Sequence, residues 1–161
     1  MCIRDSFQLV HGGEAALVHV APLDAAGPRR LRQRCVAAIL AGQEAGVIPY
    51  SPLAAGFLTG KYRRDTPLPE SARSGNVQRR YMNERGFAAV DKLEEVGRAH
   101  DATIAQTAIA WCLANPAVTS AISGANSIAQ LEDTARGAAV TLSADDKAAL
   151  DALTDWSRRD G

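Results

Sequence analysis

The order of apolar and polar positions predicts an α/β protein, because short apolar runs alternate with segments of helical periodicity. Residues 46–50 form a compact apolar run that predicts a buried strand of the parallel kind. Pro52 has no backbone N–H and favours an extended Ser51, so strand pairing is expected to end there. A second apolar run, 118–122, predicts another strand that turns through a glycine into a helix.

Four segments carry helical signals. Residues 83–99 repeat apolar side chains about every three positions, and Thr103 with Gln106 forms a capping box for a helix that ends at 115–116. Ser127 with Gln130 has the form of a second capping box, and residues 144–156 form a last helix with Ser143 as its cap. The side chains expected to be buried on these helices are Phe87, Val90, Leu93, Val96, Ile104, Ala108, Trp111, Ile128, Leu131, Ala135, Leu150 and Leu153.

The remaining segments are less regular. Residues 16–20 and 28–40 carry a short strand pattern and a short helix pattern, and residues 63–85 are polar, contain prolines and predict a long surface loop. Residues 61–85 hold seven basic side chains against three acidic ones, so the loop is either a solvated charged loop or a flap over the phosphates of a ligand. The first six residues resemble translated adapter sequence, and we hypothesise that residues 1–45 include a misread or frame-shifted stretch.

Composition changes this picture little. Lysine plus arginine and aspartate plus glutamate both number 18, and 47% of the 161 residues are hydrophobic, which predicts one globular domain and no general polyanion binder. No apolar run approaches the roughly 20 residues that cross a bilayer, so we expect a cytoplasmic protein without membrane partners. The three cysteines, Cys2, Cys35 and Cys112, lie far apart without neighbouring histidines, so we expect neither disulfides nor a metal site.

Two strand ends are candidate ligand sites. Beyond the first, Gly56 and Gly60 let the backbone approach a ligand and Lys61 adds a cation, which favours a phosphate-bearing ligand. Beyond the second, a glycine turn leads into a helix whose N-terminus can attract an anion.

The segment from Tyr50 to Tyr62, with the sequence YSPLAAGFLTGKY, resembles the seventh strand and following loop of the aldo-keto reductase family. Residues 104–111 and 122–132 resemble the family's seventh helix and its eighth strand and helix, in the same order. The resemblance covers about 110 residues, whereas a complete (β/α)8 barrel takes about 250. It therefore implies a partial TIM barrel, with residues 46–161 as the C-terminal part of the domain and residues 1–45 as a poorly matching segment.

The resemblance implies that an extended NADPH lies across the strand ends. Tyr50 would stack on the nicotinamide, and Lys61 would contact phosphate. The pyrophosphate would lie along Ser51, Pro52, Leu53, Ala54 and Gly56. The adenine and the 2′-phosphate would lie at Gly124, Asn126, Gln130, Asp133 and Thr134. Many members carry a basic residue in this second turn and Glu-Asn at positions 133 and 134, so NADH stays open as the cofactor.

The family reduces aldehydes or ketones with a tyrosine, a lysine, an aspartate and a histidine from the first half of the barrel. No tyrosine or histidine of this chain lies in a matching context, so we assign no catalytic residue and expect an incomplete enzyme. One alternative is a non-catalytic NADPH-binding regulatory module, like the potassium-channel β subunits that share this fold. The other is a helix-turn-helix DNA binder, which the strand-like link 118–122 and the acidic second helix disfavour.

Overall fold

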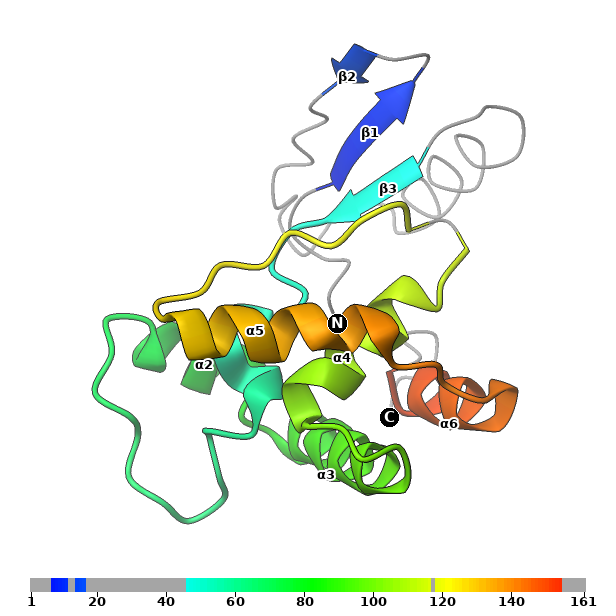
Figure 1. Cartoon of the computed structure of the whole chain (residues 1–161). Helices are drawn as coiled ribbons and strands as arrows, with labels where there is room; N and C mark the ends of the chain where they lie inside the picture. Colours follow the sequence, from blue (N-terminus) through cyan, green and yellow to red (C-terminus); the bar gives the residue numbers. More distant parts are fainter. Residues whose placement is uncertain (1–6, 12–13, 17–45, 117, 155–161) are drawn as a thin grey trace, which may run out of the picture.

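A computed structural model of the chain describes residues 7–11, 14–16, 46–116 and 118–154. Figure 1 shows a small sheet at one end and a body of helices at the other. The strands are β1 (Phe7–His11), β2 (Glu14–Ala16) and β3 (Gly46–Pro49). The helical elements are the 3-10 turn η1 (Ala54–Thr59), α2 (Ser74–Tyr81), α3 (Glu84–Ala99), α4 (Ile104–Leu113), α5 (Ile128–Arg136), the 3-10 turn η2 (Gly137–Ala139) and α6 (Ala144–Thr154).

The predicted strand at 46–50 is confirmed as β3, but its neighbours differ from the expectation. The sheet has the order β2-β1-β3, and β1 pairs antiparallel with both other strands, with Ile48 opposite Gln8. The expected parallel pairing is reduced to one isolated bridge between Tyr50 and Ile122. Of the weak N-terminal patterns, residues 17–20 and 28–40 lie outside the described residues, and β2 reaches residue 16.

The core lies between η1 and the helices α2, α3, α4 and α6. On α3 the predicted stripe is confirmed, because Phe87, Val90, Leu93 and Val96 are all buried. Asn83 caps the helix by accepting a hydrogen bond from the Gly86 N–H. Each large aliphatic side chain fully buried in this way stabilises the fold by about 1.5–3 kcal/mol. The buried cluster consists of Ala54, Phe57, Leu58, Tyr62, Val77, Phe87, Val90, Leu93, Ala108 and Leu150.

Helix α4 is the central helix of this body. Its capping box is present as predicted, since Thr103 accepts from the Gln106 N–H and Gln106 accepts from the Thr103 N–H. Residues 105–110 are all buried, and Trp111 packs partly buried against the core while its indole N–H donates to Asp151 at 2.8 Å. The apolar, alanine-rich face of α4 can be covered closely because its neighbours α3, α5 and η2 all contact it.

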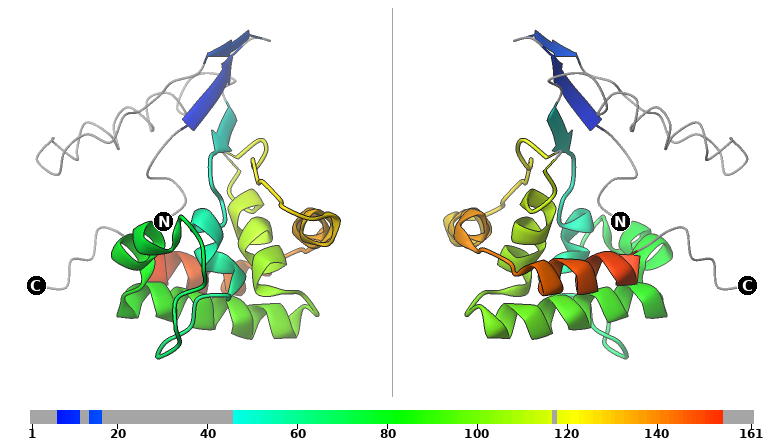
Figure 2. Two further views of the ribbon diagram at one scale, coloured as in Figure 1. Left: turned by 90° about the vertical axis from the view of Figure 1, so that its left-hand side faces the viewer. Right: turned by 90° about the vertical axis from the view of Figure 1, so that its right-hand side faces the viewer.

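The expectation that α5 buries an apolar face is wrong. None of its residues is buried, and Ile128 and Leu131 are 76% and 56% exposed. Figure 2 shows α5 nearly end-on at the outer edge of the helical body, where it lies against α4. An amphipathic stripe becomes buried only where another layer covers it, and no described residue covers this one.

The polar segment 63–85 is not entirely a loop, because residues 74–81 form α2 with Val77 in the core. The last predicted helix is confirmed as α6, which ends at Thr154 in the structure, and residues 155–156 lie outside the described part. Leu150 is buried on its inner face and Leu153 is half-buried. Within the described ranges, no helix is long and apolar enough to cross a membrane.

Candidate functional site

The first corner is the turn formed by residues 50–61, which follow the end of β3. Tyr50 follows the strand and is 60% exposed, while Pro52 is buried. Ser51 is not extended as expected, since its φ is +63°. The left-handed residue reverses the chain, and its side-chain oxygen accepts a hydrogen bond from the Ala55 N–H at 3.1 Å. The chain therefore turns directly from the strand into η1, and the Tyr50 ring stays exposed beside the end of the strand.

The turn that follows is tightly wound. Ala54, Ala55 and Gly56 all have positive φ, and Gly60 does as well. The Ala54 and Gly56 N–H groups donate to the carbonyls of Ser51 and Leu53, both at 2.9 Å. These donors belong to the group of backbone amides predicted to face a pyrophosphate, and in the structure they hold the turn together.

Lys61 lies directly over this turn. A Cβ added at Gly56 would stand 3.0 Å from both Cε and Nζ of Lys61, so the bare glycine makes room for the lysine side chain. The ammonium lies 5.2 Å from the centroid of the Tyr62 ring. Within the described ranges, no carboxylate forms an ion pair with Lys61. The first corner thus carries a cation available to an anionic ligand.

The second corner is built by residues 118–127, which do not form the predicted regular strand. Isolated bridges stand at Val118 and Ile122, and the intervening Thr119 and Ser120 are exposed. Regular pairing needs a neighbour along the whole segment, and the pairing found among the described residues is the one between Ile122 and Tyr50 at the end of β3. The contact that remains is the Ile122 N–H donating to the Pro49 carbonyl at 3.3 Å. It sets the two corners side by side.

The turn into α5 is capped in an unexpected way. Ser127 accepts from the Gln130 N–H at 3.2 Å, as a capping box requires. The Gln130 side chain, however, accepts from the Asn126 N–H at 2.9 Å instead of from Ser127. The predicted reciprocal box is therefore corrected to one bond plus a brace across the turn. Gly124 lies in open space, because a Cβ added there would have no atom within 4 Å.

Asp133 has partners that the sequence reasoning missed. Its Oδ1 accepts from Gln106 Nε2 at 2.7 Å and from Thr103 Oγ1 at 3.0 Å. Thr103 and Gln106 are the capping pair of α4, so Asp133 fastens α5 to the start of the central helix. The capping motif was readable, but nothing local connects it to a carboxylate 30 residues later in the chain.

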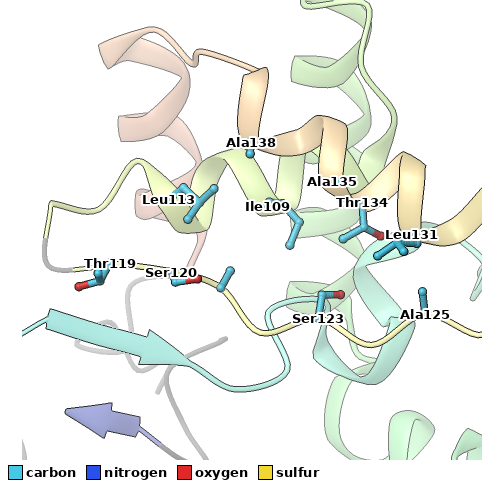
Figure 3. A pocket seen from close by; sticks show the side chains of 11 residues that line it. Ile109, Leu113, Thr119, Ser120, Ser123, Ala125, Leu131, Thr134, Ala135 and Ala138 are labelled. Atoms are coloured by element: carbon cyan, nitrogen blue, oxygen red, sulfur yellow. The ribbon is translucent and has the colours of Figure 1, made fainter. Parts of the chain in front are cut away.

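Thr134 faces a pocket of about 350 Å³ between α4, α5 and residues 119–125. Figure 3 shows Ile109 and Leu113 of α4, Leu131 and Thr134 of α5, and Ser123 converging on this space. Its lining is mostly apolar with a few hydroxyls. The pocket reflects the irregular path of residues 119–125, which leaves the layer between strand end and helices incompletely filled.

The start of the basic loop is bound to α3. Arg64 donates to Asp91 at 2.8 Å, pairs with Glu84 at 3.6 Å and stands 4.8 Å from the Phe87 ring centroid. Arg63 pairs with Glu94 at 3.4 Å. The hydrogen bonds from Arg98 and then from Arg63 lower the pKa of the Glu94 carboxyl. Neither arginine is free to move to a ligand without breaking these contacts.

The arrangement suits an extended, phosphate-bearing ligand. An exposed aromatic ring and a lysine without an ion pair among the described residues mark the first corner, and a polar turn with open space marks the second. Of the residues predicted to hold a dinucleotide, Tyr50 and Lys61 therefore lie at the first corner and Asn126 lies in the second. In the part of the chain that the structure describes, no cluster of histidine, cysteine or acidic side chains could hold a metal ion.

The candidate ligand site lies at the end of β3, beside the segment that contains Ile122, and α/β proteins bind their ligands at the carboxyl ends of strands. The chain belongs to the aldo/keto reductase family, whose family model matches residues 15–155. Membership implies the (β/α)8 barrel as the architecture of the family domain. The described residues are mostly helical, with one short sheet. Because the match begins at residue 15, the boundary drawn at residue 46 stays a prediction.

Several proteins are similar to this chain. A probable voltage-gated potassium channel β subunit of Arabidopsis thaliana is 36% identical over 93 residues, which is 55% of this chain and 28% of that protein. The L-glyceraldehyde 3-phosphate reductase of Escherichia coli is 34% identical over 93 residues, 55% of this chain and 27% of that protein. An uncharacterized oxidoreductase of Bacillus subtilis is 33% identical over 110 residues, 68% of this chain and 31% of that protein.

The glycerol dehydrogenase of Gluconobacter oxydans is a structural neighbour with a TM-score of 0.61 and 26% identity. The alignment covers 78% of this chain and 38% of that one. The chain thus spans less than a third of the length of the three curated relatives above.

Proposed function

We propose that this chain is the C-terminal, cofactor-binding part of an NAD(P)H-dependent aldo-keto reductase that reduces aldehydes or ketones to alcohols. Residues 46–161 form this part, preceded by the poorly matching segment 1–45. The observation that supports it most directly is the hydrogen bond from the Ile122 N–H to the Pro49 carbonyl, at 3.3 Å. It sets two β-to-α corners beside each other, as one extended dinucleotide requires.

Each end of the cofactor has its own residues. At the first corner, the exposed Tyr50 ring stacks on the nicotinamide and Lys61 neutralises the pyrophosphate. The turn formed by Ser51, Pro52, Leu53, Ala54 and Gly56 lies along it. At the second corner, the adenosine end is held by Gly124, Asn126, Gln130, Asp133 and Thr134. The bound dinucleotide supplies the hydride, and the chain supplies orientation and charge.

The proposal assigns no proton donor, because no tyrosine or histidine of this chain lies in a context that matches the family's catalytic residues. Among the described tyrosines, Tyr62 has a buried hydroxyl that forms no hydrogen bond with the described residues. A carbonyl reduction needs an acid close to the carbonyl oxygen. Catalysis therefore depends on residues that this sequence does not place in a matching context, and the chain alone binds cofactor without turnover.

A second candidate is a non-catalytic, dinucleotide-binding regulatory module. It is favoured by the 36% identity to a probable potassium channel β subunit. Helix α5 gives little support to the DNA-binding alternative, because its single basic residue, Arg136, pairs with Glu132 at 3.8 Å. Both candidate functions use the same cofactor site, so cofactor binding does not distinguish them. Adding the first half of the barrel, with its catalytic residues, does distinguish them, because only a reductase would then reduce a carbonyl.

The test is a fluorescence titration of the full chain with NADH and with NADPH. We expect saturable binding, and we expect Tyr50→Ala and Lys61→Ala each to weaken it about tenfold, or about 1.4 kcal/mol. The loss in Lys61→Ala should shrink as salt is added, because exposed charge interactions are screened. Lys92→Ala is the matched control, since Lys92 pairs with Glu95 on α3, away from the site. No binding of either nucleotide, with the chain folded by circular dichroism, would reject the proposal.

A further inference from the structure

Helix α5 is attached to the helical body without burying any of its nine residues. Its main contacts are with α4 and with the turn η2. Its large apolar side chains, Ile128 and Leu131, are 76% and 56% exposed. Helices α3 and α6, by contrast, bury Leu93 and Leu150 in the core. The burial of apolar surface therefore holds α5 in place much less firmly than it holds its neighbours.

Asp133 makes the side-chain hydrogen bonds that join α5 to another helix. Its carboxylate accepts from Gln106 Nε2 at 2.7 Å and from Thr103 Oγ1 at 3.0 Å, and both donors lie at the start of α4. The other side-chain contacts of α5 are local, because Arg136 pairs with Glu132 at 3.8 Å and the cap bonds stay within the first turn. Within the described ranges, the polar attachment of α5 to α4 therefore depends on one carboxylate.

The two ends of α5 are packed differently. After the helix, Gly137 of η2 lies so close to α4 that an added Cβ would stand 2.8 Å from the Gln106 carbonyl oxygen. Before the helix, residues 119–125 follow an irregular path, and a Cβ added at Gly124 would have no atom within 4 Å. The chain is therefore closely packed at the C-terminal end of α5 and has open space at the N-terminal end.

The layer between α5 and α4 is also incompletely filled. The pocket of about 350 Å³ lies between these helices and residues 119–125, and Figure 3 shows Leu131 and Thr134 of α5 and Ile109 of α4 at its wall. An unfilled space lacks the dispersion contacts that would otherwise hold the two helices together. Moving α5 away from α4 on this side thus breaks few contacts.

We propose that α5 is a hinged lid over this pocket, that it opens as a unit about η2, and that Asp133 is the latch that keeps it closed. The motion goes beyond the proposed function, because it needs no bound cofactor. A helix of nine residues is unstable in water without its neighbours, so the open segment also loses its backbone hydrogen bonds. Opening exposes the apolar wall of α4 to solvent while the core around Leu93 stays folded.

Hydrogen–deuterium exchange of the full chain, followed by NMR, measures this opening, because a bonded amide exchanges only when its hydrogen bond breaks. We expect amides 131–136 to share one level of protection, roughly tenfold or more below that of the Leu93 amide in α3. Their exchange should change little in low concentrations of urea, since a local opening exposes little surface. The exchange of Leu93 should accelerate, since it requires global unfolding.

Two variants test the latch. Asp133→Ala should speed the exchange of α5 about tenfold and leave Leu93 nearly unchanged, because it removes hydrogen bonds to a charged acceptor that act only on the lid. Glu132→Ala is the matched control, since it removes a neighbouring carboxylate whose partner, Arg136, lies on α5 itself. It should change the exchange of α5 by less than about threefold.

The outcomes are distinct. If α5 and Leu93 exchange at the same rate in the unaltered chain, α5 opens only with the whole fold and the lid is rejected. A steady decline of protection from one end of α5 to the other would mean fraying, which also rejects the lid. If Asp133→Ala speeds the exchange of α5 no more than Glu132→Ala does, or speeds α5 and Leu93 equally, Asp133 is not the latch.

Discussion

The hydroxyl of Tyr62 is an exception to the rule that buried polar groups are paired. The residue is 1% exposed, and its oxygen has no partner among the described residues. An unsatisfied buried polar group costs about 1–3 kcal/mol. The ring itself is well placed, at 6.2 Å from Phe57 between centroids, so the aromatic body is retained for packing while the oxygen adds a penalty.

We therefore expect Tyr62→Phe to raise the free energy of unfolding by about 1 kcal/mol. Urea denaturation followed by circular dichroism measures the change. Tyr50→Phe is the control, because Tyr50 is 60% exposed and its hydroxyl carries no burial penalty. A loss of stability in Tyr62→Phe would mean that the hydroxyl has a partner in the folded chain.

Asp146 ties the start of α6 to the end of α3. Its carboxylate accepts from Ser143 Oγ at 2.6 Å and contacts His100 Nε2 at 2.9 Å. The hydrogen bond from Ser143, followed by the one from His100, lowers the pKa of Asp146. As the pH falls, Asp146 is therefore protonated in the unfolded chain before it is protonated in the folded chain. Asp146 thus contributes full stability above about pH 4, and this contribution is lost as the pH falls through the lowered pKa.

Asp146→Asn should accordingly reduce the stability at pH 7 by about 1 kcal/mol and flatten the acid side of the stability profile. Chemical denaturation at a series of pH values from 7 down to the acid transition checks both effects. Asp145→Asn is the matched control, because Asp145 occupies the same helical turn and is exposed. Equal profiles for the two variants would contradict the role given to Asp146.

At the scale of elements, two glycines differ in the space around them. A Cβ added at Gly75 in α2 would have no atom within 4 Å, whereas a Cβ at Gly137 would stand 2.8 Å from the Gln106 carbonyl oxygen. Gly137 begins η2, which packs directly on α4. The two elements can approach this closely only because glycine has no side chain at this position.

We expect Gly75→Ala to stabilise the protein by about 0.5–1 kcal/mol through helix propensity. Gly137→Ala should destabilise it by about 1–3 kcal/mol, because backbone atoms must move apart. Thermal unfolding of the two variants gives shifts of opposite sign if this is right. A neutral result at Gly137 would show that η2 can withdraw from α4 at little cost.

The elements differ in how far the sequence could predict them. The period of apolar residues placed α3 correctly, since this signal is local. The helix α2 was missed because its one buried apolar residue, Val77, stands among polar neighbours. The exposure of α5 and the irregular segment 118–122 could not be foreseen, because burial and strand pairing depend on which other layers are present.

The candidate site, too, could be predicted from the sequence only in part. Its two corners followed from glycines, prolines and the family resemblance, and the structure sets their strand ends side by side through Tyr50 and Ile122. The left-handed Ser51 and the partners of Asp133 did not follow, because the first depends on the reversal of the chain and the second on a contact 30 residues away. The binding roles themselves stay predictions.

For the molecule as a whole, several large apolar side chains are left uncovered by the described residues. The large hydrophobic side chains Tyr50, Ile122, Ile128 and Leu131 are 60%, 47%, 76% and 56% exposed. Exposed apolar side chains of this size favour association with other surfaces. The isolated chain should therefore self-associate as its concentration rises.

The double variant Ile128→Ser and Leu131→Ser should lower this association and change the free energy of unfolding by less than about 1 kcal/mol. Light scattering coupled to gel filtration measures the first effect, and urea denaturation measures the second. Leu93→Ser, at a position that is 0% exposed, should unfold the protein and serves as the contrast. A large loss of stability in the double variant would show that α5 is covered in solution.

The hydrogen bond from Ile122 to Pro49 also makes a single amide proton a reporter for the whole cofactor site. At 3.3 Å it is a long bond, and no regular ladder flanks it on the side of residues 118–122. Its exchange with deuterium should be fast in the free chain and slow markedly once a dinucleotide spans both corners. One resolved signal in an isotope-labelled spectrum would thus register whether the halves of the site move together or apart.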